Sequence, residues 1–215
     1  MTEKTLDPRY RINIESGLRV MIEEENSDNS ELIPCYVKEI ISSDSIVESG
    51  VKIICEDDKV GRIKYIGTES TYKKPIELII ILEKKIRKLV VEILSNHDSN
   101  WWENQIPSLV QEAVDEKQKR GIKQKEELKI PEYEQIEETD FFHLHLIIGY
   151  KKNWKIFFEP IFKSKPETMK KLVDLSSYRN LPAHSKDLTE NIEEKIKTYF
   201  DDLILLIEAF YRKQN

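Results

Sequence analysis

The chain has 215 residues, of which 39% are hydrophobic and 34% are charged. This composition is polar for a globular protein but too rich in aliphatic and aromatic residues for a disordered one, so we expect a buried core. The formal net charge of −6 excludes a protein that coats nucleic acid through bulk positive charge, because such binding requires the neutralisation of many phosphates. Any contact with RNA or DNA must therefore be local.

The N-terminal segment MTEKTLDPRYR has no apolar signal core, and the longest apolar run, around residues 79–82, is too short to cross a bilayer. We therefore expect a soluble cytoplasmic protein with no membrane partner. Cys35 and Cys55 are far apart in the sequence and neither has a histidine nearby, which favours buried free thiols over a zinc site. The sequence predicts no metal site and no cofactor.

Residues 1–68 contain short β-branched runs separated by turn residues. Four of these runs predict strands: SGLRVMIEE, CYVKEIIS, GVKIICE and GRIKYIG. Between them, Asn, Ser, Asp and Gly supply turns through local hydrogen bonds and tolerance of positive φ. Because open strand edges invite pairing with other chains, we expect this small β-domain to close into a barrel or a curled sheet.

The segments IESGLRVMIEE and VKEIISSDSIVESGVKIICEDDKVGRIKYIG resemble the YwbE-like small domain, whose pattern includes Gly-[IV]-Lys-[VI] and a closing Val-Gly-Arg-[VI]-Lys. The resemblance covers about a quarter of the chain and implies a small β-fold. It fails at the turn EEENSDNSE, which is acidic where the family has a basic turn, so we carry over no function of that turn. An accessory role with nucleic acid, or a protein partner bound by this domain, remains an expectation.

Residues 73–215 follow a helical period instead. PIELIIILEKKIRKLVVEIL has apolar residues three and four positions apart, with Pro75 in the first turn. Further helices are expected over residues 107–119, in KPETMKKLVDLSSYRN, and in TENIEEKIKTYFDDLILLIEAFYRK with Thr189 as its cap. Residues 119–138 are expected to form an exposed connection with about one helical turn, followed by two short apolar segments, the second ended or kinked by Pro160.

The predicted fold class is therefore α+β with two domains. A small N-terminal β-barrel or curled sheet, residues 1–68, precedes an all-α bundle of about five helices, residues 73–215.

The segment SYRNLPAHSK, residues 177–186, lies between two predicted helices. On one continuous helix Arg179 and His184 would point about 140° apart, so a helix cannot pair them. Pro182 ends the helix and fixes a tight connection, which can bring a guanidinium and an imidazole to one anionic group. Such a pair suits metal-independent cleavage of RNA, with His184 as general acid/base and Arg179 stabilising charge on the phosphate.

RNLPAH is similar to the motif of the HEPN superfamily, with Arg179, Asn180 and His184 matching its arginine, polar residue and histidine. Residues 73–215 also resemble the HEPN group at the C-terminus of certain eukaryotic RNA-surveillance endoribonucleases. The resemblance implies a helical bundle and a metal-independent endoribonuclease in which these three residues form the catalytic set. It also implies a homodimer whose two motifs meet, and products with 2′,3′-cyclic phosphate and 5′-hydroxyl ends. Lys186 stands where some HEPN toxins have a tyrosine, so regulation through that tyrosine is not carried over.

Lys84, Lys88 and Lys186 are candidate contacts for single-stranded RNA or structured RNA loops. The basic face formed by Lys84, Lys85, Arg87 and Lys88 is more typical of a solvated helix surface than of an RNA guide. Glu83 and Asp174, on helices expected to border the motif, are candidates to orient Arg179 or His184.

Other residues favour structural roles. His143 and His145 suit satisfied or surface positions better than a metal pair. Trp101, Trp102 and Trp154 favour packing in the core over stacking with bases. The alternative to catalysis is a non-catalytic HEPN module that binds RNA, nucleotide or protein and dimerises, with Arg179 and His184 capping helices or binding carboxylates.

Overall fold

A computed structural model describes residues 6–25, 31–128, 135–181 and 188–214, those of 120–128 as backbone only. The chain divides into two compact units, Met1–Lys74 and Pro75–Asn215. Each unit has its own cluster of buried apolar side chains. The α+β class expected from the sequence is confirmed, with strands in the first unit and helices in the second.

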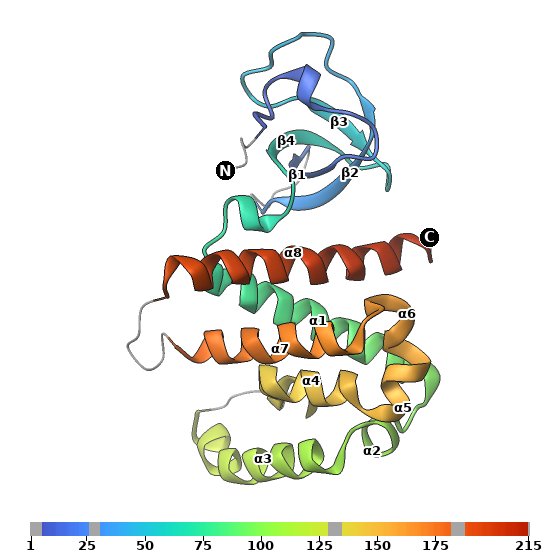
Figure 1. The fold of residues 1–215 in the computed structure, drawn as a ribbon, viewed down its shortest axis with the longest axis vertical. Helices are drawn as coiled ribbons and strands as arrows, with labels where there is room; N and C mark the ends of the chain where they lie inside the picture. The colour runs from blue at the N-terminus through green and yellow to red at the C-terminus, as the bar shows by residue number, and fades with distance from the viewer. Residues whose placement is uncertain (1–5, 26–30, 129–134, 182–187, 215) are drawn as a thin grey trace. The chain divides into compact units, whose positions relative to one another are not determined.

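The N-terminal unit is a closed antiparallel barrel (Figure 1). Its strands in the described part of the chain are β1 Arg19–Glu24, β2 Ile33–Ile40, β3 Lys52–Cys55 and β4 Val60–Ile66. Consecutive strands pair, and β1 also pairs with β4, so that Val20 lies opposite Cys35 and Ile22 lies opposite Ile63. Each strand therefore has a partner on both sides, as the argument from open edges predicted.

The barrel is filled by apolar side chains from all four strands. Val20, Ile22, Val37, Ile53 and Ile63 are completely buried. β1 is buried on its outer side as well, where the Arg19 guanidinium pairs with the Glu69 carboxylate at 3.1 Å. Glu69 begins the short 3₁₀ helix η2, Glu69–Thr71, so this buried ion pair fixes the end of the barrel segment to its first strand.

The two cysteines form a disulfide between β2 and β3. The prediction of free thiols was wrong, because Cys35 and Cys55 are 20 residues apart in sequence but lie on neighbouring antiparallel strands. Both are buried in the barrel, at 4% and 1% exposure. The disulfide therefore crosslinks the core of the N-terminal unit.

The second unit is helical throughout its described residues. Its α-helices are α1 Pro75–His97, α2 Trp101–Gln105, α3 Ser108–Leu128, α4 Phe141–Gly149, α5 Lys151–Asn153, α6 Glu159–Phe162, α7 Lys165–Asn180 and α8 Glu190–Arg212. The 3₁₀ helix η3, Gln135–Glu138, precedes α4, and the π-helical turn η4, Trp154–Phe158, joins α5 to α6. The long helices α1, α7 and α8 confirm the helical periods in the sequence, and Thr189 is the N-cap residue of α8 as predicted.

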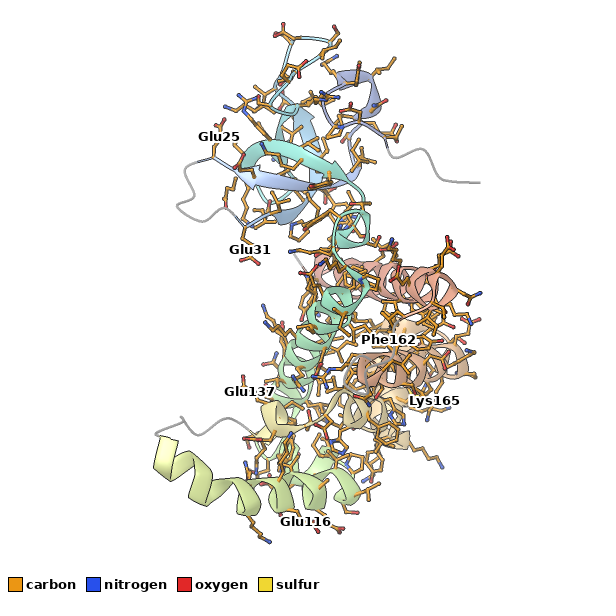
Figure 2. The ribbon with its side chains drawn as sticks, turned by 90° about the vertical axis from the view of Figure 1, so that its left-hand side faces the viewer. Glu25, Glu31, Glu116, Glu137, Phe162 and Lys165 are labelled. Atoms are coloured by element: carbon orange, nitrogen blue, oxygen red, sulfur yellow. A yellow bond between two sulfur atoms is a disulfide. The ribbon has the colours of Figure 1, made fainter. Side chains whose placement is uncertain are left out.

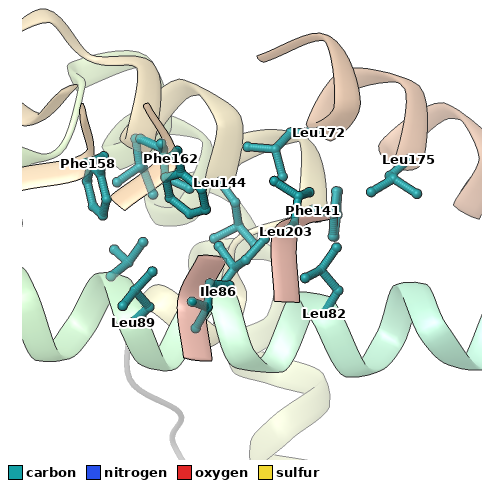
Figure 3. Close-up of a cluster of buried hydrophobic side chains, with 14 of the residues drawn as sticks. Leu82, Ile86, Leu89, Phe141, Leu144, Phe158, Phe162, Leu172, Leu175 and Leu203 are labelled. Atoms are coloured by element: carbon teal, nitrogen blue, oxygen red, sulfur yellow. The ribbon is translucent and has the colours of Figure 1, made fainter. Parts of the chain in front are cut away.

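The core of the helical unit forms where α1 contacts α4, α7 and α8 (Figure 3). Leu82, Ile86 and Leu89 lie on one face of α1 and are completely buried. Phe141 and Leu144 of α4, Leu172 and Leu175 of α7, and Leu203 of α8 surround them. Figure 2 shows Phe162 within this unit and Glu116 on its outside, in agreement with their burial.

Two expectations for the helical unit need correction. The expected connection 119–138 is helical as far as Leu128, because Lys, Glu, Gln and Arg are good helix formers even next to Gly121. Pro160 does not end the second apolar segment, because residues 151–162 form one helical run. It lies two residues after the π-helical turn η4, so only the expectation that the segment ends at Pro160 was wrong.

Candidate functional site

The first part of the Arg–His motif lies in the last turn of α7. The helix ends at Asn180, as the proline at position 182 predicted. The Arg179 side chain is half-buried and Asn180 is exposed. His184 and Lys186, the other predicted site residues of this segment, lie outside the described residues.

Arg179 forms an ion pair with Glu83 of α1. Its Nε lies 3.0 Å from Glu83 Oε2, and the two side chains are 38% and 4% exposed. Glu83 is buried because it belongs to the core-facing side of α1, next to Leu82. Since a buried carboxylate needs charged or hydrogen-bonding partners, Glu83 holds the guanidinium of Arg179 against α1.

Of the two acidic residues expected to border the motif, Glu83 contacts Arg179. Asp174 lies on a different side of α7, where it accepts hydrogen bonds from Lys170 Nζ at 2.5 Å and from the Tyr199 hydroxyl at 3.3 Å. Asp174 thus joins α7 to α8, and the structure assigns the orientation of Arg179 to Glu83.

A second arginine binds the other oxygen of Glu83. Arg87 Nη2 lies 2.5 Å from Glu83 Oε1 and donates to the Thr139 carbonyl oxygen, also at 2.5 Å. Arg87 had been counted with the basic outer face of α1, but its side chain is only 21% exposed. One carboxylate between two guanidiniums leaves this cluster with a net positive charge.

This arrangement suits the binding of an anion. Arg179 engages Glu83 through Nε, and as far as the described residues go, its two terminal nitrogens have no protein acceptor. A guanidinium presents its donors as a planar fork that matches two phosphate oxygens. With more than a third of its side chain exposed, Arg179 is accessible to such a ligand.

The candidate RNA contacts on α1 are on its surface. Lys84 and Lys88 are exposed and lie one helical turn apart, so they occupy the same face of the helix. They follow Glu83 and Arg87 by one position each, so this face adjoins the buried ion pairs. The structure therefore places both lysines on the exposed surface of α1, about 100° around the helix from Glu83 and Arg87.

The histidines of α4 have roles within their own helix. His143 Nδ1 accepts a hydrogen bond from the Asp140 N–H at 3.0 Å, at the N-cap of α4. His145 Nδ1 contacts the Phe142 carbonyl oxygen. Partial burial lowers the pKa of both imidazoles below the ordinary value. Within the described residues, no three potential metal ligands lie together.

The tryptophans pack in the helical core as predicted. Trp102 and Trp154 are 6% and 3% exposed, and Trp101 packs against the same core cluster. The rings of Trp102 and Trp154 are therefore part of the core, whereas Trp101 is half-buried at its edge.

The comparisons with known proteins add no relative. No family model matches the chain, and neither a curated protein nor a solved structure matches it. No helix in the described residues is long and apolar enough to cross a membrane. The functional argument therefore depends on the residues and their geometry.

The role of Arg87 was missed by the sequence analysis. The sequence did contain a feature that points to this ion pair, since Glu83 and Arg87 have the i, i+4 spacing that brings opposite charges together on a helix. The spacing could not show that this pair faces inward, because that depends on how α1 packs against α4 and α7.

Proposed function

We propose that the helical unit is a metal-independent endoribonuclease of the HEPN type. The observation that supports this most is the Arg179 guanidinium at the end of α7, held through Nε by a buried carboxylate and accessible to an anion. The sequence continues from this point directly to His184, the histidine of the motif. RNA cleavage without a metal needs a general acid/base and a cation that stabilises the phosphate, and we assign these roles to His184 and Arg179.

In the proposed reaction, His184 accepts the proton of a ribose 2′-hydroxyl. The 2′-oxygen then attacks phosphorus, the bond from phosphorus to the 5′-oxygen breaks, and the imidazolium of His184 returns its proton to the leaving oxygen. Arg179 stabilises the negative charge that grows on the non-bridging oxygens, and Asn180 donates a hydrogen bond that orients the phosphate. The products carry a 2′,3′-cyclic phosphate and a 5′-hydroxyl.

The substrate in this proposal is single-stranded RNA or a structured RNA loop. Lys84 and Lys88 bind its backbone beside the site, since each exposed cation can neutralise a phosphate. The active form is a homodimer in which two motifs meet, as in the family that the motif resembles. The barrel selects a substrate or a protein partner.

The cytoplasm is the proposed place of action. Disulfides are uncommon in that compartment because its thiols are kept reduced. Cys35 and Cys55 are buried inside a closed barrel, where a disulfide is shielded from attacking thiolates and can persist once formed.

Substitution of the motif arginine tests the proposal. We expect Arg179→Ala and His184→Ala each to lower the rate of RNA cleavage by about 10²–10⁴-fold. Lys171→Ala is the matched control: it also removes an ion pair from α7, with Asp202 at 2.7 Å, but lies outside the proposed site. Cleavage that survives both motif substitutions would contradict the proposal.

A wild-type protein that binds RNA but does not cleave it would instead favour the non-catalytic module. In that case Arg179 would contribute to RNA binding or to the stability of the helical bundle. Its substitution would weaken RNA binding, and neither wild type nor variant would cleave the RNA.

A further inference from the structure

Arg87 connects the candidate site to the backbone ahead of α4. Its Nη2 donates both to Glu83 Oε1 and to the Thr139 carbonyl oxygen, each at 2.5 Å, and its Nε lies 3.5 Å from Thr139 Oγ1. Thr139 is 2% exposed and its hydroxyl donates to the Ile136 carbonyl oxygen at 2.6 Å. The guanidinium of Arg87 is therefore anchored to main-chain atoms of a buried segment.

This anchor matters because a glutamate side chain has several rotatable bonds and does not fix its own carboxylate. Arg87 holds Oε1 of Glu83 from one side, which leaves Oε2 directed to Arg179 Nε at 3.0 Å. A lysine at position 87 could supply the charge but not the planar fork whose Nη2 and Nε contact two atoms of Thr139. The order of contacts is thus Thr139 backbone, Arg87, Glu83 and Arg179.

We propose that Arg87 is a positioning residue for Arg179, acting through Glu83. It fixes the carboxylate so that Glu83 holds Arg179 at Nε, and the terminal nitrogens of Arg179 then bind the substrate phosphate. The catalytic part of this inference rests on the proposed ribonuclease function, whereas the positioning itself is a property of the folded chain. Arg87 does not touch the substrate.

Hydrogen exchange of the arginine Nε–H tests the positioning without any activity. In ¹⁵N-labelled full-length protein, the ion pair with the buried Glu83 carboxylate should slow exchange of the Arg179 Nε–H, and Glu83→Gln should weaken that protection. We expect Arg87→Met to increase the exchange rate of this proton by about tenfold or more, since the Glu83 carboxylate loses its anchor. Lys171→Met, which breaks a different ion pair of α7, should leave the rate within about twofold of wild type.

An unchanged Arg179 exchange rate in folded Arg87→Met would overturn the inference. If Arg87→Met does not fold, Arg87→Lys decides the question, because it keeps the charge and removes the fork. Protection intermediate between wild type and Glu83→Gln supports positioning by Arg87, and full wild-type protection contradicts it.

Kinetics separate this inference from the proposed function. If the wild type cleaves RNA, Arg87→Lys should lower kcat by about 10–100-fold while KM changes by less than about threefold, because Arg179 is misplaced rather than removed. Equal kcat in wild type and Arg87→Lys would count against the inference. If the wild type cleaves no RNA, the proposed function fails, and the exchange rates still decide the role of Arg87.

Discussion

The carboxylate of Glu83 lies inside the helical unit with a guanidinium on each side. Its two oxygens bind Arg87 and Arg179 separately, so neither oxygen is left without a cation. Neither arginine is fully exposed, and both would have to find new acceptors if the carboxylate were removed. Glu83 therefore links the packing of α1 and α7 to the orientation of the motif arginine.

We expect Glu83→Ala to destabilise the folded chain by about 1–3 kcal/mol, because two partly buried guanidiniums lose a charged acceptor. Denaturation by urea, followed by far-ultraviolet circular dichroism, measures this. Glu112→Ala on the exposed side of α3 is the control and should change stability by less than about 0.5 kcal/mol. Equal stability of the two variants would show that the ion pairs of Glu83 contribute nothing to the fold.

At the scale of single residues, the sequence indicated the site only in part. Arg179 and Asn180 were found from their motif, and Glu83 was one of two acidic candidates to orient it. Choosing between Glu83 and Asp174 required the packing of α7, since the two carboxylates lie on different helices and only one faces Arg179. Arg87 was assigned to the surface because a basic cluster in a sequence does not show which of its members turns inward.

Among the secondary-structure elements, the barrel strands combine two kinds of constraint. Backbone pairing closes β1 onto β4, and the disulfide joins β2 to β3. Gly50, before β3, has a φ of 94°, and a Cβ there would collide with the Ile63 carbonyl oxygen. The barrel therefore depends on a glycine and a disulfide in addition to its apolar core.

We expect loss of the disulfide to destabilise the barrel by about 3 kcal/mol, the loop-entropy value for a separation of 20 residues. Urea unfolding of the oxidised chain, compared with the chain in reductant and with the Cys35→Ala, Cys55→Ala double variant, measures this. The transition of the helical unit serves as the internal control, because the crosslink lies wholly within the barrel. A barrel transition at the same urea concentration in the oxidised chain and in the double variant would contradict this prediction.

The two histidines of α4 predict a dependence of stability on pH. Partial burial lowers the pKa of His143 and of His145, so the folded chain binds their protons less readily than the unfolded chain does. Their contribution to stability is complete above the unfolded-state pKa, about 6.5, and is lost as the pH falls below it toward the lower folded-state values.

We therefore expect the free energy of unfolding to decrease between about pH 6.5 and pH 5, and to decrease less in a His143→Gln, His145→Gln variant. Urea denaturation at several pH values provides the comparison, and pH 7.5, where both rings are neutral, gives the reference for each protein. Identical pH profiles for variant and wild type would rule out these imidazoles as the source.

The extents of the elements were predicted with uneven success. The β-branched runs were sufficient to locate the strands, and the apolar stripes were sufficient to locate α1, α7 and α8, because burial on one face imposes a period on the sequence. The end of α3 was not predicted, since the charged C-terminal half of this helix has no apolar stripe. Its helical conformation depends on the helix propensity of its residues. The disulfide was missed because pairing of Cys35 with Cys55 depends on the register of β2 and β3.

The whole molecule consists of a disulfide-linked barrel and a helical unit with separate cores. The candidate site belongs to the helical unit, since its described residues come from α1, α7 and the segment ahead of α4. The division into strands and helices followed from the change of hydrophobic period between residues 68 and 73.

The central claim is that the helical unit cleaves RNA without a metal ion. The most direct measurement incubates the wild-type chain, Arg179→Ala and His184→Ala with single-stranded and structured RNA in EDTA and maps the ends of the products. The account predicts cleavage by the wild type alone, with 2′,3′-cyclic phosphate and 5′-hydroxyl ends. Cleavage that requires Mg²⁺ and leaves 5′-phosphates, or that persists in both variants, would contradict it.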